Sequence, residues 1–189
     1  MKFNTHSTLE GRHSSLSASK YHWIRYSNEK FIESFHKAEA ARLGVRLHAF
    51  ADEAIKMGIK LENNSKTLNR YINDCIGYRM STEVVLRYSD NAFSTADALD
   101  FTKNPHSDRM ILRCFDLKNG VSPASGDQLL VYAAYFCLEY GVRPMEIDYD
   151  LRIYQNDDFV EIEVNAEDIL YIMDRIVEFD ALISEIRGG

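Results

Sequence analysis

The sequence predicts a mixed α/β domain in which a central β-sheet is flanked by helices. Three observations lead to this prediction. Apolar residues recur at helical spacing over the first third of the chain, and three short segments rich in β-branched and aromatic residues follow. A helical segment then separates the third of these from two further strand-like segments, and this connection is long enough for a parallel crossover.

Length and composition predict one globular domain. The chain has 189 residues, of which 46% are hydrophobic and 27% charged. We therefore expect a single domain over residues 1–189, mainly helical over 1–80 and built on the sheet over 81–189. The longest clean apolar run, residues 129–138, is about half of what a membrane span requires, so no membrane association is expected. The polar N-terminus predicts no secretory signal.

The first eighty residues alternate between polar segments and predicted helices. A polar lead over 1–28 contains Ser14, Ser15, Ser17 and Ser19, which are typical of a loop or a helix cap, followed by aromatic residues expected to pack onto the body. Apolar spacing predicts helix from about 29 to 60, in which Gly44 marks either a break or a close contact. Residues 61–66 read as a loop and 67–78 as a short helix.

The remaining residues alternate between strands and helices. Runs of β-forming residues separated by turn residues predict the strands, and apolar spacing predicts the helices. Gly141 and Asn165 are expected to end the first helix and to cap the second. The expected strands are 81–89, 92–101, 110–118, 146–154 and 159–164, and the expected helices are 125–141 and 166–186.

The cysteines and the net charge each exclude a class of protein. Cys75, Cys114 and Cys137 are odd in number and far apart, without a C-x-x-C pair, so we expect buried thiols in a reducing cytoplasm rather than disulfides or a zinc site. The net charge of −7 argues against a large polyanion-binding surface. Nucleic-acid contacts would therefore be local or helped by bound cations.

Two aspartates and a lysine stand out in the predicted sheet. Asp116 and Lys118 are two apart at the end of an apolar strand and therefore point to the same face. Asp97, between two alanines, lies on the preceding strand and can converge with Asp116. Two close carboxylates favour a divalent cation between them. The alternative is a plain salt bridge between Asp116 and Lys118.

This pattern resembles the PD-(D/E)XK nuclease superfamily, and further motifs resemble its RecB-type branch. The segment Gln128 to Ala133 matches the Q-x-x-x-Y-A motif that follows the catalytic strand, and Gly44 to His48 matches the G-x-x-x-H motif. Glu83 occupies the position of a core glutamate, and residues 16–19 resemble the L-S-x-S start. The resemblance covers about residues 13–185 in the right order. It implies a restriction-endonuclease-like core.

The chain departs from this branch in several respects. Ser94 stands where the branch usually has glycine, and Asn119 stands where it has threonine. Three scattered cysteines cannot supply the four-cysteine iron–sulfur cluster of some members, so no cluster is expected. The chain contains no helicase motif. These features resemble a free-standing nuclease of the phage or mobile-element kind, in the cytoplasm of the host.

The resemblance implies a metal-dependent deoxyribonuclease. Asp97, Asp116 and His48, with the carbonyl of Leu117, would hold Mg²⁺ or Mn²⁺, and Lys118 would assist the attacking water. The substrate would be DNA, with linear ends processed by exonuclease action in recombination, repair or phage replication; endonuclease action is the alternative. A recombination or single-strand-binding protein is a candidate partner.

The other motif residues each have a functional and a structural interpretation. Glu83 either binds a second metal ion or supports the metal ligands, or it is a solvated residue on the strand face. Gln128 and Tyr132 position Lys118 or touch DNA, although Tyr132 also suits a core. Ser17 and Ser19 contact phosphate or cap a helix. His48 is otherwise a partly buried helix histidine.

Two further hypotheses concern the whole chain. It is either an active nuclease or a catalytically silent nucleic-acid-binding or assembly protein that keeps the fold, an alternative for which Ser94 and the acidic net charge leave room. If it binds DNA, the path is expected to be a local basic strip, because basic residues outnumber acidic ones near the N-terminus. The strip candidates are Arg12, Lys20, Arg25, Lys30, Arg42 and Arg46.

Overall fold

The structure is a computed structural model that describes residue 8 and residues 14–120 and 124–188. Contacts divide the chain into two compact units, Met1–Leu43 and Gly44–Gly189, and each is described by itself. The elements in chain order are η2 (Ala18–Arg25), α1 (Asn28–Met57), α2 (Thr67–Tyr78), β1 (Ser81–Arg87), β2 (Phe93–Lys103), β3 (Met110–Leu117), α3 (Asp127–Tyr140), η3 (Pro144–Glu146), β4 (Ile147–Gln155), β5 (Asp158–Glu161) and α4 (Ala166–Gly188).

The first unit contains the 3₁₀ helix η2 and the N-terminal half of α1. Ser17 takes the N-cap position of η2 but makes no side-chain capping bond. Its hydroxyl instead lies 2.8 Å from the hydroxyl of Ser19. The indole N–H of Trp23 donates to the carbonyl of Ser17 at 3.2 Å, which ties the end of η2 back to its start. The serines therefore belong to an ordered turn around the tryptophan.

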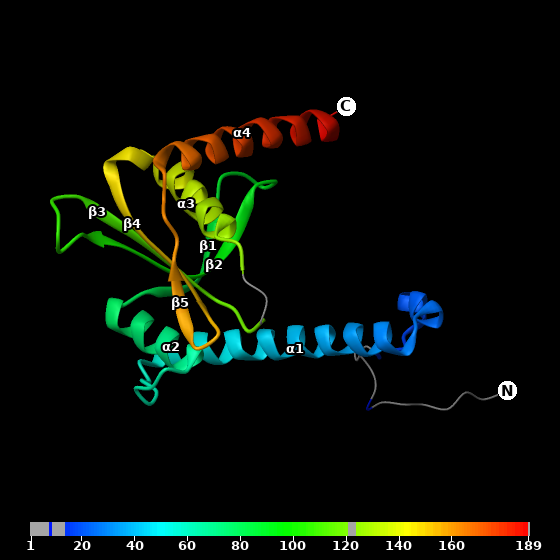
Figure 1. The fold of residues 1–189 in the computed structure, drawn as a ribbon. Coiled ribbons are helices and arrows are strands. Elements are labelled where there is room, and N and C mark those ends of the chain that lie inside the picture. The colour runs from blue at the N-terminus through cyan, green and yellow to red at the C-terminus, as the bar shows by residue number, and fades with distance from the viewer. Residues whose placement is uncertain (1–7, 9–13, 121–123, 189) are drawn as a thin grey trace. The chain divides into compact units, whose positions relative to one another are not determined.

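A five-stranded mixed sheet organises the second unit. The strands lie in the order β1-β2-β3-β4-β5, with β3 and β4 parallel and the other neighbours antiparallel. Helix α3 forms the connection from β3 to β4, which confirms the predicted crossover. Figure 1 shows α3 and α4 on one side of this sheet and α2 on the other. The predicted fold class, a central mixed sheet flanked by helices, is confirmed.

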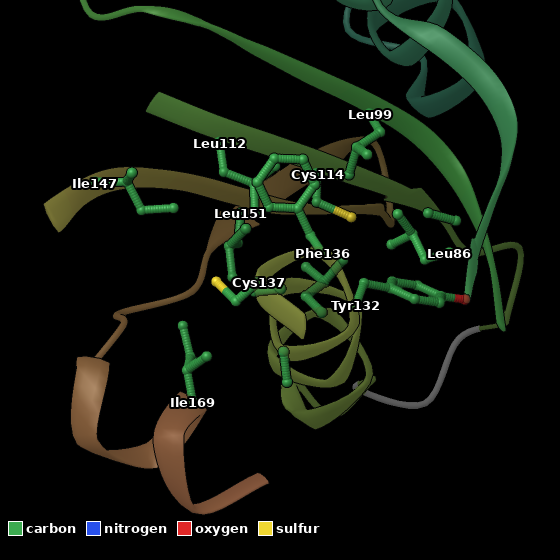
Figure 2. Packing of buried hydrophobic residues seen from close by; sticks show 14 of the residues in the cluster. Leu86, Leu99, Leu112, Cys114, Tyr132, Phe136, Cys137, Ile147, Leu151 and Ile169 are labelled. Atoms are coloured by element: carbon green, nitrogen blue, oxygen red, sulfur yellow. The ribbon is translucent and has the colours of Figure 1, made fainter. Parts of the chain in front are cut away.

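Each face of the sheet carries its own hydrophobic cluster. The α3-side cluster packs sheet residues such as Leu112, Cys114 and Leu151 against α3 and Ile169 of α4. Figure 2 shows Tyr132, Phe136 and Cys137 of α3 beneath these sheet residues. The α2-side cluster joins Ala51, Ala54 and Ile55 of α1 and Tyr71, Ile72 and Cys75 of α2 to Phe115, Leu117 and Tyr154. The strands of β3 and β4 are therefore buried on both faces, as parallel strands usually are.

A kink in β1 and β2 interrupts the regular alternation of side chains between the two faces of the sheet. Ala96 and Ala98 are two apart and would normally share a face, yet Ala96 lies in the α3-side cluster and Ala98 in the α2-side cluster. Glu83 has a φ of 51° and lies between the pairs Thr82↔Ala98 and Val84↔Ala96, so it stands across from Asp97. The alternation of faces is thus interrupted at Asp97.

Most predicted boundaries agree with the observed ones to within a few residues. Gly44 does not break α1; it lies inside one continuous 30-residue helix. Gly141 ends α3 with a φ of 64°, and the side chain of Asn165 accepts from the N–H of Glu167 at 3.1 Å, as a cap should. The last strand ends at Glu161 rather than 164, because the chain then turns towards α4.

The cysteines and the helices bear on two further predictions. Cys75, Cys114 and Cys137 are buried free thiols, as predicted. Among residues 14–120 and 124–188, no helix has the length and apolar composition needed to cross a bilayer. The predicted buried role of the three cysteines is therefore confirmed.

Candidate functional site

Four elements bring the predicted site residues together in the second unit. His48 comes from α1, Asp97 from the kink in β2, and Asp116 and Lys118 from the end of β3. Gln128 and Tyr132 come from the first two turns of α3. Ala98 pairs with Phe115 at the end of the ladder, and Asp97 and Asp116 are the residues that follow this pair on the two strands. Topology thus joins residues that are far apart in sequence.

Asp97 connects α1 with the end of β3. One of its carboxylate oxygens, Oδ2, lies 3.2 Å from Nδ1 of His48 and accepts the backbone N–H of Leu117 at 3.1 Å. The ladder between β2 and β3 ends at Ala98↔Phe115, and beyond it the side chain of Asp97 accepts the backbone N–H of Leu117. The carboxylate is therefore fixed from two sides.

A chain of polar contacts links Asp116 to α3. Lys118 Nζ lies 2.9 Å from Oδ2 of Asp116 and donates to Oδ1 at 3.1 Å. The same ammonium donates to Oε1 of Gln128 at 2.9 Å, and the amide of Gln128 donates to the hydroxyl of Tyr132 at 2.6 Å. Because Tyr132 is buried in the α3-side cluster, it anchors this chain to the core. Both interpretations of Tyr132, core residue and member of the site, therefore hold together.

Burial and charge strongly affect protonation at the site. The side chain of Asp116 is only 2% exposed. This burial, together with the negative charge of Asp97, raises the pKa of Asp116 to about 6, although Lys118 and His48 oppose the shift. The hydrogen bond to Asp97 raises the pKa of His48, against the opposing effect of burial. The site therefore holds protons more tightly than the free side chains do.

The donor set is suited to a hard divalent cation. Oδ2 of Asp116 is buried and has no hydrogen-bond partner within the described part of the chain, although Lys118 pairs with it ionically. A carboxylate oxygen in that state is stabilised by a cation, and carboxylates with one imidazole suit Mg²⁺ or Mn²⁺. Within the same described residues, no three His, Cys, Asp or Glu side chains form a preformed metal-binding group. Lys118 and His48 instead neutralise the two carboxylates.

Other predicted residues take different places. Glu83 is exposed on β1, across from Asp97 at the kink, and has a φ of 51°. Ser17 and Ser19 belong to the first unit, where they hydrogen-bond to each other. Of the basic-strip candidates, Lys20, Arg25, Lys30 and Arg42 are exposed in the first unit and Arg46 is exposed in the second. Arg12 lies outside the described residues.

A cavity of about 380 Å³ adjoins the site and includes residues that the sequence analysis did not single out. Leu117, Lys118 and His48 form one side of it. The N-terminus of α2 and the turn between β4 and β5 form the other, through Thr67, Leu68, Asn156 and Asp157. Asn156 and Asp157 have φ values of 55° and 59°, which a two-residue hairpin turn requires. The turn signal was visible in the sequence, but its proximity to Lys118 depends on the sheet order.

Gly44 is a second residue whose role emerges from the fold. A Cβ atom at this position would lie 2.9 Å from Oδ1 of Asn119. Gly44 therefore permits close approach of the segment that follows Lys118, which resolves the predicted alternatives in favour of a close contact.

Comparison of the chain with protein-family models, with curated proteins and with solved structures finds no match.

Proposed function

We propose that this protein is a divalent-metal-dependent deoxyribonuclease that hydrolyses phosphodiester bonds, with linear DNA ends as its substrate. The observation that carries the proposal is the convergence of His48, Asp97, Asp116 and Lys118 from three separate elements. The motif resemblance assigned nuclease roles to these same four residues. The buried carboxylate of Asp116, which lies beside Asp97 and is paired with Lys118 at 2.9 Å, is of a chemical type that a divalent cation binds.

Each residue has a distinct part in this proposal. His48, Asp97 and Asp116 would hold the cation, which would supply Lewis-acid polarisation of the phosphate and promote ionisation of water. Lys118 neutralises negative charge that develops on the phosphate and orients the attacking water. Gln128, held by Tyr132, fixes the position of the Lys118 ammonium. His48 and the N–H of Leu117 keep the Asp97 carboxylate oriented.

The carboxylate pair also explains why the chain places two cationic groups here. Lys118 and protonated His48 offset the charges of Asp116 and Asp97 before a cation binds. Lys118, which pairs with Asp116 in the structure, would be available to the phosphate if a cation neutralised that carboxylate. Cation binding requires deprotonated ligands, so affinity should increase with pH across the range in which Asp116 and His48 lose their protons.

The decisive experiment incubates the full chain with end-labelled linear duplex, linear single-stranded and circular DNA. Each is tested with Mg²⁺, with Mn²⁺ and with chelator. We expect cleavage of the linear substrates that depends on metal and is abolished in the Asp116→Asn variant. If the parent binds DNA but leaves every substrate intact in both metals, the silent binding protein is the correct interpretation.

A further inference from the structure

The first unit contains a second pocket that the proposed chemistry does not use. It has a volume of about 530 Å³ and lies between η2 and the N-terminal half of α1. Residues spaced along one face of α1, namely Phe31, Phe35 and Ala38, form one wall, and Trp23 and Tyr26 form the other. All of its lining residues fall between Ser15 and Arg42, within the first unit.

The lining has the chemistry of a site for flat rings attached to a negatively charged chain. Trp23, Tyr26, Phe31 and Phe35 supply aromatic surface, and Ala38 and Ala41 leave room beside it. Lys20, His22 and Arg42 supply nitrogen donors, Arg42 also pairing with Glu39 at 2.5 Å. No Asp or Glu is among the described residues that line the pocket. A pocket for an apolar peptide would require neither basic side chains nor a lining without carboxylates, so this lining favours a ligand that carries negative charge.

The charge of the chain is divided between the two units. Residues 1–43 contain seven Lys and Arg and four Asp and Glu, a net charge of +3. Residues 44–189 contain fifteen and twenty-five, a net charge of −10. Four of the six histidines also lie in residues 1–43. The net charge of −7 therefore conceals a basic unit able to attract a polyanion.

We propose that this aromatic pocket binds unpaired bases of single-stranded DNA. Stacking on aromatic side chains beside cations is the usual means of binding single strands, and paired bases cannot offer their faces in this way. The choice of DNA as the polymer rests on the proposed function. The pocket would hold the strand independently of cleavage, because none of the described residues that line it belongs to the cleavage site.

Trp23 offers a direct test because it is the only tryptophan in the chain. Its emission is followed while the full protein, in chelator, is titrated with oligothymidylate of about ten nucleotides. A matched abasic oligomer carries the same phosphates without bases. We expect saturable quenching by oligothymidylate and binding about tenfold weaker or more for the abasic chain. Equal binding and quenching by the two oligomers, or no quenching by either, would overturn the proposal.

Variants locate the binding and separate it from catalysis. Tyr26→Ala should weaken binding about tenfold whereas Tyr26→Phe should not, because the ring alone is required. Lys20→Ala should reduce the slope of log affinity against log salt by about 0.7. Tyr171→Ala, at an aromatic residue 66% exposed on α4, is the matched control and should bind like the parent. If Tyr171→Ala weakens binding as much as Tyr26→Ala, the pocket is not the site.

The same titration distinguishes failure of this proposal from failure of the nuclease proposal. Lys118→Ala should still show saturable quenching of Trp23 by oligothymidylate, whatever its cleavage rate. Quenching without any metal-dependent cleavage would support the binding pocket and contradict the nuclease proposal. Metal-dependent cleavage by a protein whose Trp23 emission does not respond to oligothymidylate would support the nuclease proposal and contradict the binding pocket.

Discussion

Nδ1 of His48 and Oδ2 of Asp97 lie 3.2 Å apart, although 48 residues separate them in the sequence. The intervening chain includes the end of α1, all of α2 and β1, and the start of β2. The contact joins the helical layer to the kinked strand. It also makes the charge of each group depend on the other, because the hydrogen bond to Asp97 raises the pKa of His48.

Lys118→Ala should separate catalysis from metal binding. The substitution removes the ammonium from both Asp116 and Gln128 but leaves the carboxylates and His48 in place. We expect single-turnover cleavage to fall by about 100-fold or more, with Mn²⁺ binding by calorimetry retained. The control is Lys103→Ala, which changes an exposed lysine of β2 and should cleave like the parent. A Lys118→Ala protein as fast as the parent would refute the catalytic role.

Asp116→Asn should weaken metal binding and stabilise the metal-free protein. Burial raises the pKa of Asp116 from its ordinary 3.8 to about 6, so the folded state loses stability as the pH rises across that window. At pH 8 in chelator, removing this charge should raise the free energy of unfolding by up to about 3 kcal/mol, at 1.36 kcal/mol per pKa unit. Below the ordinary pKa of aspartate the difference should vanish.

Denaturant titrations at several pH values measure this effect, and Asp148→Asn is the matched control. Hydrogen bonds from Ser107 and Asn104 lower the pKa of Asp148, so its neutralisation should destabilise the protein at pH 8. If Asp116→Asn instead unfolds far more readily than the parent in chelator, the Asp116–Lys118 pair is a structural salt bridge.

His48→Gln should remove the loss of folding stability that the parent shows as the pH rises through the folded pKa of His48. The pKa of His48 is raised above its ordinary 6.5, so its contribution to stability is present below that value and is lost as the pH rises through the folded pKa. The variant should lack this loss in chelator and should bind Mn²⁺ more weakly. His36→Gln, at an exposed histidine of α1, should retain the parental pH profile. Parental Mn²⁺ affinity in His48→Gln would exclude the histidine as a ligand.

Gln128→Ala should act through Lys118. The amide oxygen of Gln128 accepts from Lys118, and its nitrogen donates to Tyr132. We expect cleavage to fall by about tenfold, with no further loss when Lys118 is already alanine. A double-mutant cycle of single-turnover rates measures this coupling. Independent, additive effects would show that Gln128 does not position the lysine.

Gly44→Ala should reduce cleavage without destabilising the fold. The new Cβ would meet Oδ1 of Asn119 at 2.9 Å and displace the residue that follows Lys118. Alanine is also the better helix former by about 1 kcal/mol, so stability should not fall. Gly77→Ala, where a Cβ meets nothing within 4 Å, is the matched control and should cleave like the parent. The double variant with Asn119→Ala should cleave like Asn119→Ala alone.

Local sequence patterns were enough to predict most elements. The short helix over 67–78 has strong apolar spacing and a loop on its N-terminal side, and its predicted range agrees with Thr67–Tyr78. The strand ending at Leu117 was also predicted to within one residue. These features depend on contacts between near neighbours in sequence, which periodicity records.

The features that escaped prediction depend on non-local contacts. Nothing near Asp97 in sequence shows that the alternation of side chains between the two sheet faces is interrupted there, because the kink involves Glu83 on another strand. Whether Gly44 breaks its helix or permits a close contact could be decided only once Asn119 was located. The aromatic pocket likewise required the turn that places Trp23 opposite Phe35. Burial of Asp116 exceeded what a strand-end position indicates.

The kink at Glu83 and Asp97 bears on how the second unit unfolds. Because β2 contributes Ala96 to one hydrophobic cluster and Ala98 to the other, neither cluster can come apart without disturbing the same strand. Disruption of either hydrophobic cluster should therefore also displace Asp97, which lies between Ala96 and Ala98 on this strand. Native-state hydrogen exchange should accordingly find the strand amides on both sides of the kink opening in one cooperative event, with a common free energy, rather than layer by layer.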